Sequence, residues 1–214
     1  MTPERAARIE YAAARRQMNM TVVLENVHDP HNIAAVLRSC ESVGMTEIYV
    51  LYTEEHLIKR GLKVGKRTSA GARKWVDVHL YRDLDRCLKA VKAKYSLIYG
   101  THLGQSSRSI FEMDFTQCFA LLLGNEADGI SEKAMQYVDR NIHIPQMGMV
   151  QSLNISVSAG VILYEVLRQR MSKGMYKNNP TQTEEQGKAI KADFYLRHEE
   201  GRKGDWALEE DWEA

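Results

Sequence analysis

The sequence contains few cysteines, and their placement excludes two kinds of site. The three cysteines, Cys40, Cys87 and Cys118, are an odd number without CxxC spacing, so neither a disulfide framework nor a zinc site is expected. His28 and His31 have no credible further ligand in the sequence, so we expect no metal centre. This cysteine usage is typical of a reducing cytoplasm, which is the location we expect.

Long apolar runs and a glycine fingerprint are also missing. No apolar run approaches the roughly 20 residues that a membrane span needs, and the opening MTPERAARIE has no signal-like stretch. We therefore expect no membrane partner. No GxGxxG motif follows a predicted strand, which argues against a nucleotide-dependent dehydrogenase. The segment GLKVGKRT at 61–68 has the wrong spacing for a phosphate-binding loop.

The composition that is present is that of an ordinary globular protein. Of 214 residues, 44% are hydrophobic and 27% are charged, which suits one packed domain with terminal extensions. We expect a basic N-terminal helix at 1–20, a main domain at 21–174, and a linker with a C-terminal helical extension at 175–214.

The net charge of +1 argues at first against a nucleic-acid partner, but the charge is unevenly distributed. Residues 184–214 contain five Lys/Arg and ten Asp/Glu, a net charge of −5, which leaves +6 for residues 1–183. Basic clusters are compatible with phosphate contacts, and solvated surface charge is the alternative. The clusters are Arg5, Arg8, Arg15 and Arg16; Lys59, Arg60, Lys63, Lys66, Arg67, Arg73 and Lys74; and Arg168, Arg170, Lys173 and Lys177.

Strand and helix patterns alternate along the chain. Several apolar runs, such as VVL and FALLL, are near-continuous, which is typical of strands that are covered on both faces. Helical patterns such as IAAVLRSCESVG and DLDRCLKAVKAKY lie between them. The alternation predicts an α/β fold with a mostly parallel, six-stranded sheet and helices on both faces. The predicted strands are 21–27, 47–52, 75–81, 96–103, 118–126 and 141–146.

Polar residues and glycines gather at three predicted junctions between a strand and a helix, where α/β proteins bind ligands. The first junction is ENVHDPHNIAAVLRSC at 25–40, in which Pro30 stops the strand and His31 or Asn32 caps the helix. Arg38 is unexpected on such an apolar helix. It either pairs with a carboxylate such as Glu126 or holds a phosphate or a developing alkoxide.

The second junction is LLLGNEADGIS at 121–131. Gly124 permits close approach of the backbone to a ligand, and Gly129 permits a positive φ. Glu126 is a candidate general base, although a loop carboxylate satisfied by hydrogen bonds is the simpler interpretation. Ser131 is predicted to cap the helix that follows.

The third junction is IPQMGMVQSLNISVSAG at 144–160, and it opens a helix predicted at 152–171. Ser152, Asn154 and Ser156 crowd its first turn, where free N–H groups and the positive end of the dipole favour a negative group. Capping explains Ser152 alone. An apolar stripe at three- and four-residue steps predicts that this helix belongs to the core. The stripe is Leu153, Val157, Val161, Tyr164 and Leu167.

Together, residues 32–38, 124–131 and 144–160 resemble the three motifs of the SpoU/TrmH family of SPOUT RNA methyltransferases. They occur in the family's order and spacing, and the similarity covers residues 20–171. The family resemblance implies a C-terminal trefoil knot, S-adenosyl-L-methionine as cofactor, and a homodimer with the active site at its interface. The segments ENVHDPHNIAAVLRSCESVG, GTHLGQSS and YEVLRQR resemble the members that methylate the ribose 2′-hydroxyl of guanosine 18 in the tRNA D-loop.

The resemblance also implies roles for single residues. Arg38 is the catalytic residue, and Asn32, Glu126, Ser152 and Asn154 support it or orient the ribose. The implied cofactor pocket contains Thr101, Leu123, Gly124, Ile144, Met149, Ser152 and Leu153. The candidate RNA contacts are His31, Arg15, Arg16, Arg168 and Arg170.

Two mechanisms and two rival functions stay open. The family mechanism makes Arg38 a general base that is activated by an RNA phosphate. An arginine with a pKa above about 12 is neutral in about one molecule in 10⁵ at pH 7, and a phosphate raises that pKa further. We therefore favour an Arg38 that positions the ribose and stabilises negative charge on oxygen. The rival functions are the same methylation at another tRNA position or on ribosomal RNA, and a non-catalytic RNA-binding protein of this fold.

Overall fold

A computed structural model describes residues 1–62, 71–102, 104, 106–150, 152–202 and 204–209. Most of the 61–68 segment, with Lys63, Lys66 and Arg67 of the second basic cluster, lies outside these residues. No described helix is both long and apolar enough to cross a membrane.

The described residues form one eight-stranded sheet with the order β5-β7-β4-β6-β1-β2-β3-β8, and every neighbouring pair is parallel. All six predicted strands are present, so the parallel α/β fold is confirmed, but the predicted number of strands is wrong. The two additional strands are β5 and β8, and each is too short to show an apolar pattern. The strands are β1 (Met20–Glu25), β2 (Glu47–Leu51), β3 (Asp77–Tyr81), β4 (Leu97–Thr101), β5 (Arg108–Ser109), β6 (Phe119–Leu123), β7 (Arg140–His143) and β8 (Trp206–Leu208).

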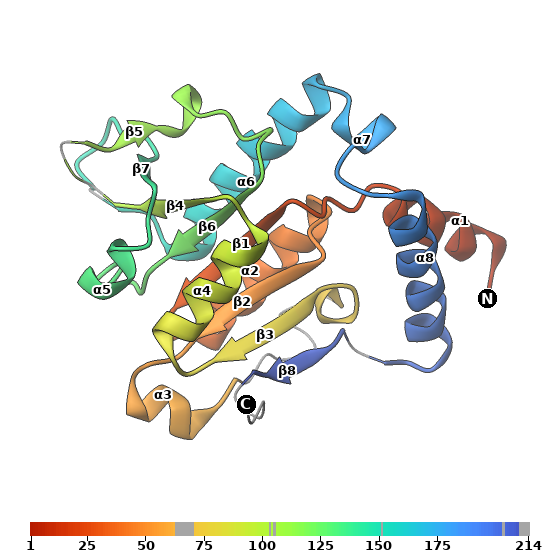
Figure 1. Cartoon of the computed structure of the whole chain (residues 1–214), viewed down its shortest axis with the longest axis horizontal. Helices are drawn as coiled ribbons and strands as arrows, with labels where there is room; N and C mark the ends of the chain where they lie inside the picture. The colour runs from red at the N-terminus through yellow and green to blue at the C-terminus, as the bar shows by residue number, and fades with distance from the viewer. Residues whose placement is uncertain (63–70, 103, 105, 151, 203, 210–214) are drawn as a thin grey trace.

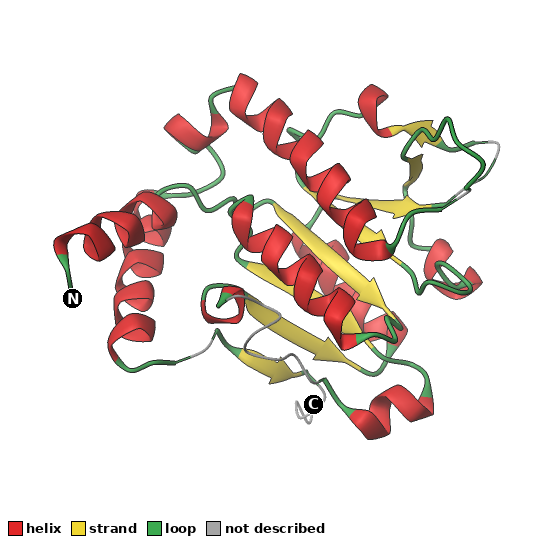
Figure 2. Cartoon of the chain, turned by 180° about the vertical axis from the view of Figure 1, so that it is seen from behind, coloured by secondary structure: helices red, strands yellow, loops and turns green. Residues whose placement is uncertain are grey.

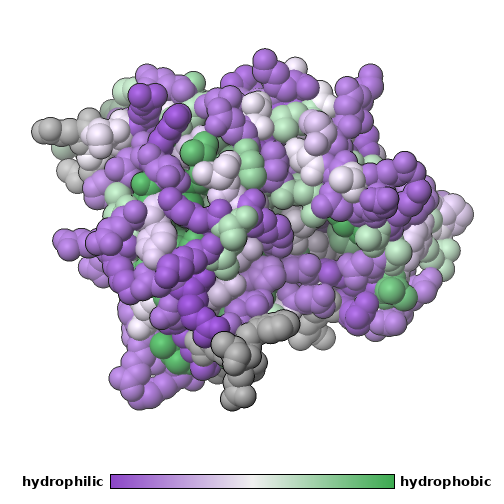
Figure 3. All heavy atoms as spheres, in the orientation of Figure 1, coloured by the Kyte–Doolittle hydropathy of each residue, from purple (hydrophilic) through white to green (hydrophobic). Residues whose placement is uncertain are grey.

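Helices cover both faces of this sheet. Helices α2 and α6 pack on one face (Figure 2), and α4 lies on the other (Figure 1). The face that carries α4 is mainly hydrophilic, with apolar residues in small patches (Figure 3). The helices are α1 (Pro3–Ala13), α2 (Pro30–Ser42), α3 (Glu55–Arg60), α4 (Leu84–Lys94), α5 (Glu132–Met135), α6 (Ile155–Ser172), α7 (Met175–Asn178) and α8 (Glu184–Glu199), with 3₁₀ turns at Ala72–Lys74 and Ile110–Glu112.

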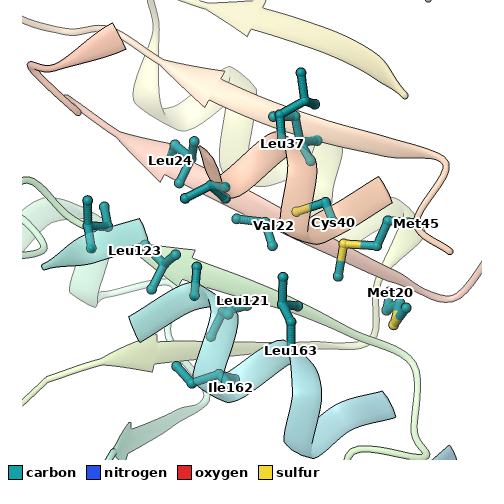
Figure 4. Close-up of a cluster of buried hydrophobic side chains, with 14 of the residues drawn as sticks. Met20, Val22, Leu24, Leu37, Cys40, Met45, Leu121, Leu123, Ile162 and Leu163 are labelled. Carbon is teal, nitrogen blue, oxygen red and sulfur yellow. The ribbon is translucent and has the colours of Figure 1, made fainter. Parts of the chain in front are cut away.

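The core lies on both sides of the central strands because consecutive strand residues point to opposite faces. Leu24 of β1 and Leu121 of β6 belong to the cluster beneath α2 and α6, whereas Val23 belongs to the cluster beneath α4. In Figure 4, side chains from β1, β6, α2 and α6 point toward one another. This packing fixes the carboxyl ends of the strands relative to α2 and α6.

The N-terminal ends of two helices differ from the predictions. Asp29, and not His31 or Asn32, caps α2, because its side chain accepts a hydrogen bond from the backbone N–H of His31. Helix α6 starts at Ile155 and its cap is Asn154, so Ser152 precedes the helix. The predicted cap at Ser131 is confirmed by its hydrogen bond from the N–H of Ala134.

Helix α6 packs in the core as predicted, but most of the predicted apolar stripe does not face the core, and of that stripe Leu167 alone packs partly against it. Val157 is 49% exposed, Val161 38% and Tyr164 57%. A different face packs against the sheet, and it contains Ile155, Ala159, Ile162, Leu163 and Val166. Helix α6 is therefore apolar on two faces, and periodicity cannot tell which one is buried.

The first and the last helix of the described chain pack beside each other. Helices α1 and α8 lie side by side, away from the sheet (Figures 1 and 2), and share a cluster of Ile9, Ala13 and Phe194. The described part of residues 175–214 contains α7, α8 and β8, and β8 adds a strand to β3. The extension therefore belongs partly to the main sheet.

Candidate functional site

A cavity of about 570 Å³ lies at the carboxyl ends of β4, β6 and β7. These strands are neighbours in the sheet, so the residues that follow them meet at one edge. Residues of the segment that leads into α6 also line the cavity. Its lining residues are Thr101, His102, Leu123, Gly124, Asn125, Glu126, Ala127, Asp128, Gly129, Ile142, His143, Ile144, Gln146, Ser152, Leu153, Asn154, Ile155 and Ser158.

Six of the residues predicted to form the cofactor pocket line this cavity. They are Thr101, Leu123, Gly124, Ile144, Ser152 and Leu153. The seventh, Met149, is fully exposed and is not among the lining residues. Both ends of the segment between β7 and α6 therefore line the cavity, whereas Met149 in its middle faces solvent.

A hydrogen-bonded network joins the three motifs beside this cavity. Nδ2 of Asn32 donates to Oε1 of Glu126 at 2.5 Å, and Nδ2 of Asn154 donates to Oδ1 of Asn32 at 3.2 Å. Oδ1 of Asn154 accepts from the backbone N–H of Ser156 at 2.9 Å and from its hydroxyl at 2.6 Å. Capping thus accounts for both Asn154 and Ser156, and it fixes the amide that reaches Asn32.

The loop after β6 is a tight turn whose backbone closes on itself. Asn125 and Gly129 exchange backbone hydrogen bonds of 3.1 Å, and Gly129 has the predicted positive φ, +72°. A Cβ on Gly124 would lie 2.0 Å from the carbonyl carbon of Gly129. Gly124 therefore packs against the backbone of Gly129 in the turn that presents Glu126, and it also lines the cavity where a ligand was expected to approach it.

Arg38 lies outside this network. It is exposed on α2 and lines a smaller hollow of about 290 Å³ together with Arg5, Arg8 and Trp75. Glu126 accepts its hydrogen bond from Asn32, so the proposed pairing of Arg38 with Glu126 is not observed among the described contacts. Within one chain, the structure joins Asn32, Glu126 and Asn154 and places Arg38 elsewhere.

Three of the five predicted RNA contacts lie at the surface. His31 is exposed at the start of α2. The guanidinium of Arg15 lies 3.6 Å from the centre of the Tyr11 ring, and both residues line a hollow of about 640 Å³. Arg168 forms two hydrogen bonds with the carboxylate of Glu165, at 2.8 and 2.7 Å, and its side chain is 67% exposed.

The other two predicted RNA contacts, Arg16 and Arg170, are buried, which corrects the expectation. Arg16 donates to the carbonyl of Met45 at 2.8 Å and pairs with Glu41 at 2.9 Å. Arg170 donates to Oδ1 of Asn19 at 2.6 Å and to carbonyl groups of the loop before β6. Burial lowers the pKa of Arg170 to about 10. These guanidinium groups join elements inside the chain and offer no surface to RNA.

Sequence reasoning missed several lining residues. His102 follows Thr101 at the end of β4, so its position after a strand was an available signal. His143 ends β7 and accepts or donates a 3.0 Å hydrogen bond with the hydroxyl of Ser107. Ser158 lies one turn inside α6, where nothing in the sequence separates it from an ordinary helical serine.

Comparison with known proteins agrees with this geometry. The SpoU rRNA Methylase family matches residues 19–164. The tRNA (guanosine(18)-2'-O)-methyltransferase of Thermus thermophilus is 42% identical over 175 residues, which cover 82% of this chain and 88% of that protein.

Two crystal structures are similar as well. The A. aeolicus TrmH/SpoU tRNA modifying enzyme has a TM-score of 0.79 and 34% identity, covering 90% of this chain and 96% of that one. The SpoU methyltransferase AviRb from Streptomyces viridochromogenes, in complex with the cofactor AdoMet, has a TM-score of 0.63 and 27% identity, covering 73% and 62%. With its three motifs gathered at one end of a parallel sheet, this chain belongs to the SpoU rRNA Methylase family.

Proposed function

We propose that this protein transfers a methyl group from S-adenosyl-L-methionine to the ribose 2′-hydroxyl of guanosine 18 in the D-loop of tRNA. The observation that carries the proposal is the network of Asn32, Glu126 and Asn154, which joins three distant motifs at the edge of the cavity. The Thermus thermophilus relative supports the choice of tRNA, since it is named for methylation of guanosine 18 and shares 42% identity.

The cavity suits S-adenosyl-L-methionine by its size and lining. Its volume of about 570 Å³ lies in the range of small-molecule sites. Leu123, Ile144 and Leu153 provide apolar surface for an adenine ring, and the carboxylates of Glu126 and Asp128 attract a positive charge. When bound, the cofactor supplies an electrophilic methyl group.

The chain's own residues then have to place the acceptor oxygen. The amide of Asn32 is held between Glu126 and Asn154, so its orientation is fixed before RNA arrives. Such positioning supplies several kcal/mol of the lowered barrier. Glu126 keeps a second carboxylate oxygen that is available to accept a hydrogen bond from a ribose hydroxyl. Arg38, always charged, stabilises the oxygen as its proton leaves.

A second copy of the chain explains the position of Arg38. Val157, Val161 and Tyr164 form an exposed apolar stripe on α6, and such stripes are typical of interfaces between proteins. Arg38 is on α2 next to Ser39, whose hydroxyl lies 3.9 Å from a Cβ built on Gly160. Helices α2 and α6 thus pack together, and we propose that Arg38 serves the cavity of a partner chain in a homodimer. The trefoil knot and the cytoplasmic location stay predictions.

Transfer of labelled methyl groups to tRNA transcripts tests the proposed acceptor. One methyl group is expected at position 18 of the natural transcript. A transcript with 2′-deoxyguanosine at this position lacks only the acceptor oxygen, so its labelling should fall to background. Unchanged labelling of the deoxy transcript would exclude guanosine 18.

Mixed dimers test the role of the partner. An Arg38→Ala chain and an Asn154→Ala chain are each expected to be inactive alone. If Arg38 acts across the interface, mixing them creates one complete site per dimer and restores part of the activity. If both residues act within one chain, every site of the mixed dimer stays defective, and the proposed sharing is wrong.

A further inference from the structure

A group of three metal-binding side chains lies outside the proposed methylation site. His28, in the loop that opens α2, meets Glu54 and His56, which lie before and within α3. One ligand atom from each residue lies within 4.8 Å of the other two. Among the described residues, this is the one such group of three His, Cys, Asp or Glu side chains. The sequence did not predict this group, because the two side chains that meet His28 come from the next strand-to-helix segment. From the sequence, only His31 was considered as its partner.

Two hydrogen bonds between Asn26 and Thr53 join the loop that carries His28 to the loop that carries Glu54. Nδ2 of Asn26 donates to the hydroxyl of Thr53 at 2.8 Å, and Oδ1 of Asn26 accepts from the backbone N–H of Thr53 at 2.8 Å. The backbone N–H of Asn26 also donates to the carbonyl of Leu51 at 2.8 Å. Asn26 has a φ of +49°, a conformation that asparagine tolerates better than most residues. The loops that carry His28 and Glu54 are therefore fixed relative to each other.

Two of the three spacings between ligand atoms suit a metal centre, and the third is at most 4.8 Å. Nε2 of His28 lies 3.1 Å from Oε2 of Glu54, and Nδ1 of His56 lies 3.5 Å from the same oxygen. Zinc bonds of about 2.0–2.1 Å at a tetrahedral angle place neighbouring ligand atoms roughly 3.3 Å apart.

The chemistry of the set favours a borderline divalent cation. Two imidazoles and one carboxylate are the protein ligands of many zinc sites that keep an open coordination position. The side chains of His28 and His56 are 43% and 65% exposed, so solvent can occupy that position. The two rings meet edge to face with centres 5.3 Å apart.

We propose that His28, Glu54 and His56 bind one zinc ion per chain. The ion fastens the start of α3 to the loop that opens α2. Because that loop leads directly to Asn32, the ion stiffens the support of the methylation site without touching its substrates. A hydrogen bond between a protonated histidine and Glu54 is the competing explanation for the short contacts, and metal titration separates the two.

The test is calorimetric titration of zinc into the chelator-treated full chain, prepared without a histidine tag. One site per chain is expected. His28→Ala, His56→Ala and Glu54→Gln should each weaken zinc binding on the order of 100-fold, because each variant removes one of only three protein ligands. His198→Ala removes a histidine on α8, far along the chain from the group, and should bind as the wild type does.

Cobalt provides a spectroscopic check of the same site. Cobalt bound to the wild type should give the strong visible absorption of a four- or five-coordinate ion, and the three variants should lose it. Zinc should also raise the melting temperature of the wild type and of His198→Ala, but not of His28→Ala. Unchanged zinc affinity in the His28 and His56 variants, or cobalt that keeps the weak spectrum of its hydrated ion, overturns the proposal.

Discussion

The side-chain amide of Asn32 donates a 2.5 Å hydrogen bond to Glu126, a residue 94 positions further along the chain. This bond connects the start of α2 to the turn after β6, and Asn154 extends the connection to the start of α6. Three loops that are far apart in the sequence are therefore joined by hydrogen bonds beside the cavity.

Asn32→Ala should lower kcat by about 10²-fold, the usual cost of a small misplacement of reacting groups. Affinity for S-adenosyl-L-methionine should stay near that of the wild type, because Asn32 does not line the cavity. The double variant Asn32→Ala/Asn154→Ala should lose much less activity than the product of the single losses, because both residues belong to one network. Single-turnover kinetics measure this, and multiplicative losses would show that the two amides act independently.

Arg38→Ala should lower kcat by about 10²–10³-fold, as expected for loss of a group that stabilises charge in the transition state. The pH–rate profile of the wild type should contain no arginine-like ionisation. Replacing Arg38 with canavanine, whose guanidino group has a lower pKa, should leave the inflections of the profile in place. An inflection that moves with this replacement would show that Arg38 is the general base.

Gly124→Ala should lower the free energy of unfolding by about 3 kcal/mol, because its Cβ would lie 2.0 Å from the backbone of Gly129 and overpack the turn. It should also weaken cofactor binding, since both glycines line the cavity. Gly148→Ala is the matched control, because no atom lies within 4 Å of its added Cβ. Urea unfolding measures both variants, and equal losses would contradict the tight turn.

Arg170→Met and Arg168→Met should differ in their effects on stability and on tRNA binding, because Arg170 is buried and Arg168 is at the surface. Loss of Arg170 leaves buried acceptors without a donor, so the free energy of unfolding should fall by about 3 kcal/mol or more. Loss of Arg168, whose side chain is 67% exposed, should cost less than about 1 kcal/mol. We expect only the Arg168 variant to fold stably and bind tRNA less tightly, as measured by unfolding and by filter binding. The opposite pattern would restore Arg170 as an RNA contact.

His79 should make the stability of the protein depend on pH. Burial opposes its charged form, but the carboxylates of Glu47 and Glu209 outweigh burial and raise the pKa of His79 above its usual 6.5. A raised pKa stabilises the fold fully below pH 6.5, and the contribution is lost as pH rises through the higher value. The stability difference between the wild type and His79→Gln should therefore shrink from pH 6 to pH 9 in urea titrations. A constant difference would contradict the charge pairing.

The parts of the fold that the sequence predicted correctly have local causes. Near-continuous apolar runs such as 119–123 indicate strands that are buried on both faces, and helices between them require parallel pairing. Strand β8 could not be predicted, because Trp206–Leu208 is short and lies in an acidic segment. Its pairing with β3 and the ion pair of Arg197 with Asp77 place it there.

The site was predictable where a motif lies next to a strand end, and unpredictable where partners come from other segments. Thr101, Leu123 and Ser152 line the cavity, as the family resemblance implied. The burial of Arg170 depends on carbonyl groups of the loop before β6, and nothing in its own surroundings in the sequence reveals them. The same applies to His28, whose nearest acidic partner is Glu54.

Strand β8 has a consequence for how the protein is made. It supplies the partner of β3 from a segment that the ribosome synthesises long after β3 itself. Until then the nascent chain carries an unpaired parallel edge, and such edges attract other strands. Chaperone binding during translation should therefore concentrate on β3, and early release of the polypeptide should lead to aggregates that grow from that edge.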